Sequence, residues 1–143
     1  MIIYSLLKMK RSPLNNLKRF TEMFTLLDQT NKTNEKVEVI KDYFAEAPPQ
    51  DKLWVLYLFS GRKLKKYFNV SQLWSWSVEF SGLPEWLVNE SYHSVGDMAE
   101  TISLILPPPV KKSKKTLSEW IEYLESLKDL TEAERKAKIL DAF

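Results

Sequence analysis

The 143 residues are enough for one helical domain, and 44% apolar with 13% aromatic residues is sufficient for a packed core. The chain has no cysteine and one histidine, which excludes disulfides, cysteine-dependent catalysis and histidine-rich metal sites. The net charge of +2 conceals an asymmetry that indicates a polyanionic partner: residues 1–20, 53–78 and 107–118 carry five, four and four basic residues and no acidic residue.

The first two predicted elements are amphipathic helices. Asn15 or Asn16 can cap a helix that runs to about Gln29, and Asn34 begins a second helix that runs to about Ala47. The apolar residues of the first recur at helical spacing and predict a buried stripe of Leu14, Leu17, Phe20, Phe24 and Leu27. The same spacing in the second predicts that the core is contacted by Val37, Ile40, Tyr43 and Phe44.

Periodicity alone does not assign residues 54–59, which are six consecutive apolar residues. They fit either a buried strand or a buried helix. Pro49 suits the first position of a helix, and Gly61 suits the position just after its end, so a buried helix is favoured.

The middle of the chain predicts three more helices. Ser71 is expected to cap a helix that ends at Gly82, and Pro84 to open a short helix with Trp86 and Leu87. Residues 91–96 are expected to form a turn. Asp97 then caps a helix that extends to about Leu106, with its apolar face formed by Met98, Ile102, Ile105 and Leu106.

Two capping motifs predict the last two helices. Thr116 pairs with Glu119, and Thr131 pairs with Glu134, in the pattern of a capping box. The pattern of the last helix is still running at residue 143, which suggests a fragment of a longer protein. We therefore expect an all-α, compact domain of about seven to eight helices that is truncated at its C-terminal end. Its expected parts are an N-terminal extension (1–13), a helical core (14–106), a Pro/Lys linker (107–115) and a C-terminal helical pair (116–143).

Residue types give little support for catalysis within this chain. The three glycines form no phosphate-binding loop of the common patterns, and the carboxylates are spaced singly on polar helix faces. No apolar run approaches the roughly 18–20 residues of a membrane span. We expect no catalytic residue, no metal site and no membrane partner, although the basic and apolar residues 1–20 also fit attachment to an anionic membrane surface.

Two short stretches are candidates for anion binding. Ser60 and Gly61 form a turn that precedes four closely spaced cations, Arg62, Lys63, Lys65 and Lys66, which can grip adjacent phosphates. Around the turn at 91–96, backbone amides at the start of the following helix can also face an anion. The simpler interpretation of the first is a solvated loop. The simpler interpretation of the lysines at 111–115 is a solubilising linker, and the simpler interpretation of His93 is a hydrogen-bonded residue in a turn.

Two stretches of the chain resemble a known family. They are residues 60–65, Ser-Gly-Arg-Lys-Leu-Lys, and residues 90–102, which contain Glu-Ser-Tyr-His and Val-Gly-Asp-Met-Ala-Glu-Thr-Ile. From about Phe20 to Phe143 the chain resembles the N-terminal DNA-binding domain of bacterial ATP-dependent DNA ligases. The resemblance implies an all-helical domain that lies against the minor groove on both sides of a nick. It also implies that the nucleotidyltransferase and OB-fold domains of the same parent chain are partners in encircling the duplex.

The resemblance also implies a DNA-binding site and a cellular context. Arg62, Lys63 and Lys65 would contact phosphates, and Lys66 would extend this patch. A second backbone contact would lie at the other motif. The complete expected site is Ser60, Gly61, Arg62, Lys63, Lys65, Lys66, His93, Ser94, Gly96, Asp97 and Met98. DNA repair or replication in the cytoplasm, at the bacterial nucleoid, is implied as well.

The chain departs from whole ligases in lacking the family's catalytic motif, a lysine followed by x-Asp-Gly, and the OB-fold. ATP and Mg²⁺ are therefore expected for the parent ligase, with no cofactor in this segment. An alternative is a helical protein–protein interaction module without nucleic-acid binding. It predicts that Trp76 or Trp86 lies in an exposed apolar patch.

Overall fold

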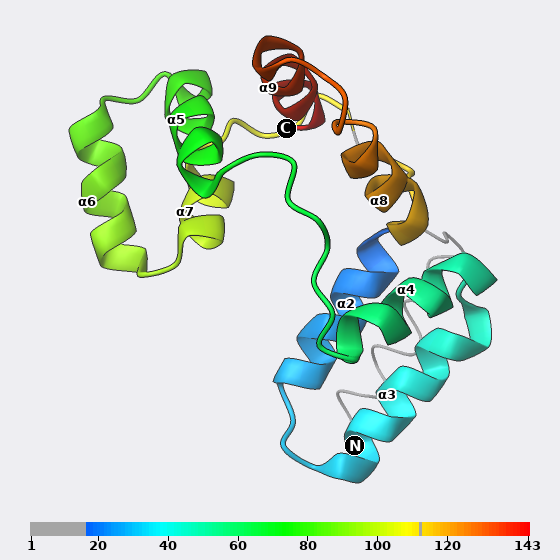
Figure 1. Ribbon diagram of the computed structural model, residues 1–143. Helices are drawn as coiled ribbons and strands as arrows, with labels where there is room; N and C mark the ends of the chain where they lie inside the picture. Colours follow the sequence, from blue (N-terminus) through cyan, green and yellow to red (C-terminus); the bar gives the residue numbers. More distant parts are fainter. Residues whose placement is uncertain (1–16, 112) are drawn as a thin grey trace. The chain divides into compact units, whose positions relative to one another are not determined.

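The computed structural model describes residues 17–111 and 113–143. All regular structure in these residues is helical, and it comprises the eight helices α2 to α9 of Figure 1. The prediction of an all-α chain with about seven to eight helices is confirmed. The predicted N-terminal extension, the caps at Asn15 or Asn16, and Leu14 lie outside the described residues.

The chain divides into two units, Met1–Lys63 with Ser113–Ile121, and Leu64–Lys112 with Glu122–Phe143. The first contains α2 (Leu17–Asp28), α3 (Thr33–Glu46), α4 (Pro49–Phe59) and the beginning of α8 (Leu117–Glu125). In this unit α2 packs against α3, and an ion pair joins Arg19 of α2 to Glu46 of α3. The buried apolar residues of the unit are Met23, Val39, Tyr43, Ala47, Val55, Leu117 and Ile121.

The predicted faces of α2 and α3 are partly wrong. Phe24 is 50% exposed and Val37 is 54% exposed, whereas Met23 and Val39 are buried. One residue turns a helix by about 100°, so Phe24 points well away from Met23, and Val37 lies on nearly the opposite side from Val39. The apolar stripes were broad enough to predict helices but too broad to identify the buried line.

Helix α4 begins at Pro49 and is followed by Gly61 in a left-handed conformation, with φ of 79°, so the helical interpretation of residues 54–59 is confirmed. Its predicted burial holds only in part. Asp51 and Val55, one turn apart, are buried, whereas Leu53 and Leu56 are 67% and 55% exposed. The buried side of this helix therefore includes a carboxyl group, while some of its apolar side chains stay at the surface.

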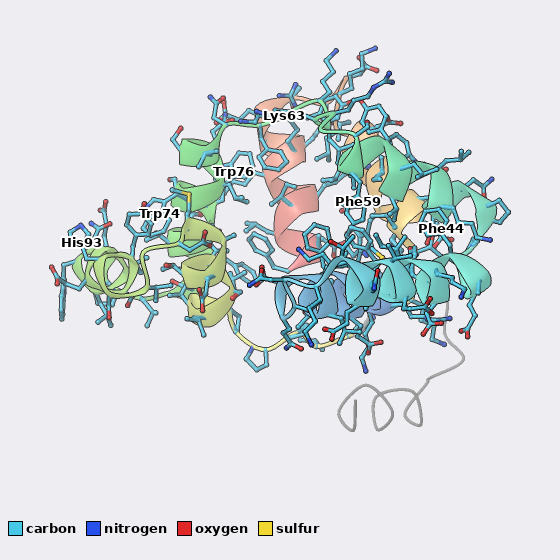
Figure 2. The ribbon with its side chains drawn as sticks, turned by 90° about the horizontal axis from the view of Figure 1, so that it is seen from below. Phe44, Phe59, Lys63, Trp74, Trp76 and His93 are labelled. Carbon is cyan, nitrogen blue, oxygen red and sulfur yellow. The ribbon has the colours of Figure 1, made fainter. Side chains whose placement is uncertain are left out.

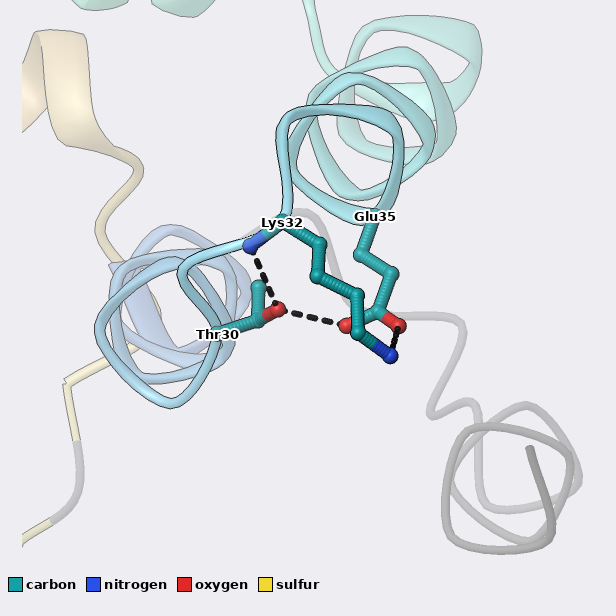
Figure 3. A network of polar contacts seen from close by, with 3 residues as sticks. All are labelled: Thr30, Lys32 and Glu35. Atoms are coloured by element: carbon teal, nitrogen blue, oxygen red, sulfur yellow. Dashed lines mark hydrogen bonds and ion pairs between the residues drawn. The ribbon is translucent and has the colours of Figure 1, made fainter.

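A network of three side chains holds the beginning of α3 (Figure 3). The Thr30 hydroxyl donates to Glu35 Oε2, the Lys32 ammonium donates to Glu35 Oε1 over 3.0 Å, and the Lys32 amide donates to the Thr30 hydroxyl over 3.2 Å. Hydrogen bonds to its charged form favour ionisation, so the Thr30 hydroxyl and then Lys32 lower the pKa of Glu35. A carboxylate in the first turn also suits the positive end of the helix dipole.

The second unit contains α5 (Val70–Ser81), α6 (Glu85–Val95), α7 (Met98–Ile105), the end of α8, and α9 (Glu132–Ala142). Helix α7 packs against both α5 and α6, and α9 packs against α5. The core cluster consists of Trp76, Leu127 and Ile139. Figure 2 shows Trp74 and Trp76 on different sides of α5: the Trp74 ring lies 5.6 Å from that of Tyr92 on α6, and Trp76 belongs to the core cluster.

Most predicted helix ends of this unit are confirmed. Gly82 and Gly96 end α5 and α6 with φ of 67° and 79°, and the Asp97 carboxylate caps α7 by accepting the Glu100 amide over 2.8 Å. Helix α9 begins with the predicted capping box of Thr131 and Glu134. In the first unit, the predicted capping box of Thr116 and Glu119 begins α8.

Two predicted boundaries are wrong. The cap of α5 is Asn69, whose amide donates to Gln72 Oε1 over 2.8 Å, and not Ser71. Helix α6 extends to Val95, so residues 91–95 are helical and only Gly96 begins the turn. Ser91 and Ser94 are small polar residues, which favour turns as well as helix ends. The Ser91 hydroxyl instead donates to the Leu87 carbonyl over 2.8 Å, which such a residue can do inside a helix.

Candidate nucleic-acid interface

The end of α4 forms a tight turn that presents the first cations. The Ser60 hydroxyl donates to the Tyr57 carbonyl over 2.7 Å, and the Gly61 amide donates to the Leu58 carbonyl over 3.1 Å. The left-handed backbone of Gly61 strains any residue with a Cβ, which explains a glycine here. The chain therefore leaves the helix abruptly, and the next two residues, Arg62 and Lys63, are exposed at its end.

Tyr57 supports this turn from within α4. Its hydroxyl donates to the Lys63 carbonyl over 3.4 Å, and the Arg62 guanidinium carbon lies 5.6 Å from the centre of its ring. A guanidinium over an aromatic face is attracted by the ring quadrupole. One aromatic side chain thus restrains both the backbone and the first cation of the basic segment, residues 62–66.

The other end of the basic segment is held in the second unit. Tyr67 and Phe68 pack against the core cluster of Trp76, Leu127 and Ile139. Arg135 of α9 donates from Nη1 to the Tyr67 carbonyl over 2.9 Å and from Nε to the Leu127 carbonyl over 3.1 Å. Lys65 and Lys66 therefore precede an anchored stretch of backbone, and both side chains are exposed.

Charge in the basic segment is not neutralised by the described parts of the protein. Arg62, Lys63, Lys65 and Lys66 are exposed, and none of them forms an ion pair with a described residue. Some lysines elsewhere in the chain are paired, as between Lys136 and Glu79 over 2.6 Å. Like charges kept close together without counter-charges create the local positive potential that attracts a polyanion.

The second predicted contact lies where α6 meets α7. His93 and Ser94 are exposed in the last turn of α6, and the Gly96 amide donates to the Tyr92 carbonyl over 2.8 Å. Since this amide already closes the helix, it is not available to an anion. In the described part of the chain the amides of Asp97 and Met98 have no backbone or side-chain acceptor, and the Asp97 carboxylate lies beside them as the cap of α7.

The structure thus assigns the predicted residues to different units. Ser60, Gly61, Arg62 and Lys63 belong to the first unit, and Lys65, Lys66 and residues 93–98 belong to the second. Two supporting residues were missed by sequence reasoning, Tyr57 and Arg135. Tyr57 is hidden in an apolar run, and Arg135 reaches a carbonyl 68 positions away, so no local pattern in the sequence signals either contact.

Metal binding and membrane insertion are two other functions for which the described residues can be considered. These residues contain no group of three or more His, Cys, Asp or Glu side chains suited to a metal ion. None of the helices described is both long enough and apolar enough to cross a membrane.

Comparison with known proteins gives one match. A family model described as DNA ligase N terminus matches residues 16–143. No curated protein and no solved structure matches the chain. The matched range includes both units' described residues and both motifs of the candidate interface.

Proposed function

The chain belongs to the DNA ligase N-terminus family, and from this membership we propose that it binds nicked duplex DNA through the phosphate backbone, irrespective of sequence. It would serve as the DNA-binding domain of an ATP-dependent DNA ligase in repair or replication, in the bacterial cytoplasm. The observation that carries the proposal is the basic segment: four exposed cations, without ion pairs to described residues, held at one end by Tyr57 and at the other by Tyr67 and Phe68.

The chemistry of the segment suits a ligase. Phosphate contacts position a protein on the duplex without reading bases, and strand joining must proceed at any sequence. The guanidinium of Arg62 can donate two parallel hydrogen bonds to one phosphate, and each lysine acts as a point charge. The nucleotidyltransferase and OB-fold domains of the parent chain would supply the chemistry, with ATP and Mg²⁺, while this domain holds the nicked duplex.

The experiment is fluorescence anisotropy of a labelled nicked duplex with the chain, over a salt series. The basic-segment variant Arg62→Ala/Lys63→Ala/Lys65→Ala removes three charges. The control variant Lys32→Ala/Lys36→Ala/Lys41→Ala removes three charges at the beginning and along the length of α3. Lys32 and Lys41 are paired with Glu35 and Glu38, and Lys36 is half-buried.

We expect the affinity of the unmodified chain to fall steeply with salt. Each lost phosphate contact reduces the log–log slope by roughly 0.9, so the slope of the basic-segment variant should be flatter by roughly two to three units. The control should retain the slope of the unmodified chain. Equal slopes for the basic-segment variant and the unmodified chain would reject the assignment of this segment, and no binding at low salt would reject the proposed function.

One observation favours the alternative, a protein–protein interaction module. Trp76 is buried, but Trp86 on α6 is 67% exposed, and its neighbours in sequence Leu83 and Leu87 are exposed as well. Glu85 and Glu90 lie on the same helix, which has no lysine or arginine. An apolar surface with acidic neighbours suits a protein better than a phosphate backbone.

The same binding assay distinguishes DNA binding from protein–protein interaction. If Trp86→Ser leaves the affinity for nicked DNA unchanged, the Trp86 surface is not part of the DNA interface and is available to a protein partner. If the unmodified chain does not bind DNA at low salt, the interaction module becomes the better interpretation of the chain.

A further inference from the structure

The stretch from Ser113 to Ser118, which contains the end of the predicted linker (107–115) and the start of α8, is fixed to the first unit. The Leu17 amide at the start of α2 donates to the Lys115 carbonyl over 3.1 Å, and the Lys115 amide donates to the Ser113 hydroxyl over 3.1 Å. The Thr116 amide donates to Glu119 Oε2 over 2.7 Å. Each of these contacts restrains backbone that a flexible linker would leave to solvent.

A buried carboxylate completes the attachment. Asp51 of α4 is 3% exposed and accepts three hydrogen bonds from the start of α8. The donors are the Leu117 amide over 3.3 Å, the Ser118 amide over 3.0 Å and the Ser118 hydroxyl over 2.6 Å. A buried carboxyl group that lost these donors would be left without hydrogen-bond partners, which would lower the stability of the folded chain. The beginning of α8, and the residues just before it, are therefore held at the N-terminal part of α4.

The fixed stretch presents two exposed lysines. Lys114 has no ion pair with a described residue, and the Lys115 ammonium lies 5.4 Å from the centre of the Trp120 ring. Cations on a restrained backbone lose less conformational entropy on binding than cations on a free linker.

We propose that Lys114 and Lys115 form a second phosphate-binding segment for the backbone of duplex DNA; this inference rests on the proposed function. Asp51 and Ser118 place the segment toward the start of α4, whereas Arg62 and Lys63 follow its end. Helix α4 has 11 residues and is therefore about 16 Å long. Duplex DNA carries one charge per roughly 1.7 Å of axis, so groups this far apart contact different phosphates.

The experiment uses the nicked duplex and salt series described above. Lys114→Ala/Lys115→Ala removes both charges, and Lys114→Arg/Lys115→Arg retains them. Lys36→Ala/Lys41→Ala is the control for the loss of two charges elsewhere. Lys114→Ala alone leaves the contact of Lys115 with Trp120 intact, so its binding reports on charge even if the double variant is less stable.

We expect the double alanine variant to have a slope flatter by roughly one to two units, and Lys114→Ala by roughly one unit. The arginine variant and the control should have the slope of the unmodified chain. Unchanged slopes for both alanine variants, with a basic-segment variant that is still affected, would overturn this inference and leave the proposed function standing. A chain that does not bind DNA at low salt would overturn both.

Discussion

At the scale of single residues, Asp51 shows how a contact can escape sequence reasoning. An aspartate in the first turn of a helix usually suits the helix dipole and faces solvent. Asp51 is instead buried and binds the start of α8 through Ser118, 67 positions further along the chain. The sequence predicted both helices and both of their starting points. It carried no signal that one helix would provide the acceptor for the amides of the other.

Glu35 gives a prediction at the same scale. Its folded-state pKa lies below its ordinary value of 4.5, through the Thr30 hydroxyl first and then Lys32. A carboxyl with a lowered folded pKa contributes stability that is present above the unfolded pKa and lost as the pH falls through the folded pKa. We therefore expect Glu35→Gln to make the melting temperature less dependent on pH between about pH 6 and about pH 3.

Thr30→Val provides the matched comparison, since it removes the main cause of the lowered pKa and keeps the carboxylate. Thermal unfolding followed by circular dichroism at several pH values measures both variants beside the unmodified chain. Thr30→Val should show part of the reduction seen for Glu35→Gln. A full pH dependence in both variants would mean that the network of Thr30, Lys32 and Glu35 is not formed in solution.

At the scale of helices, the ends were more predictable than the buried faces. The capping boxes of α8 and α9, the Asp97 cap and the left-handed glycines are local chemical patterns, and each is confirmed. Which side of a helix is buried depends on neighbours that are remote in sequence. Leu53 and Leu56 of α4 are exposed because the buried line of that helix is the one that contains Asp51 and Val55.

At Gly96 we expect substitution by residues with a side chain to destabilise the fold. Its φ of 79° lies in the region that side chains rarely adopt, and a Cβ built there meets no atom within 4 Å. The cost of Gly96→Ala is therefore backbone strain alone, about 1 kcal/mol of unfolding free energy. Asparagine tolerates this conformation better, so Gly96→Asn should cost less.

Urea unfolding of the two variants and the unmodified chain tests this order. We expect the midpoint to fall most for alanine, less for asparagine, and the dependence on urea to stay the same. If alanine were as stable as glycine, the turn between α6 and α7 would not require the left-handed backbone, and the second motif at residues 90–102 would need another explanation for its glycine.

At the scale of the whole molecule, much of the candidate site could be predicted, because its residues are adjacent in sequence. Residues 60–66 carry turn formers and cations side by side, and this pattern is visible without a structure. The contacts that restrain these residues could not be predicted, because Tyr57 acts through its ring face and hydroxyl, and Arg135 acts on a backbone carbonyl. The predicted division of the chain was into a core (14–106), a linker (107–115) and a C-terminal helical pair (116–143). The two units of the structure divide the chain in another way, and the predicted division stays a prediction.

We expect the complete chain to bind nicked duplex DNA with no preference for the base sequence. If binding uses phosphates alone, two nicked duplexes of equal length and unrelated sequence should bind with Kd values within about threefold of each other. A domain that reads base edges loses about 1–3 kcal/mol for each wrong base pair, which is roughly fivefold in Kd or more. Anisotropy competition between the two duplexes at one salt concentration measures the ratio. A tenfold preference would show direct readout, and the exposed cations at residues 62–66 would then be only part of the interface.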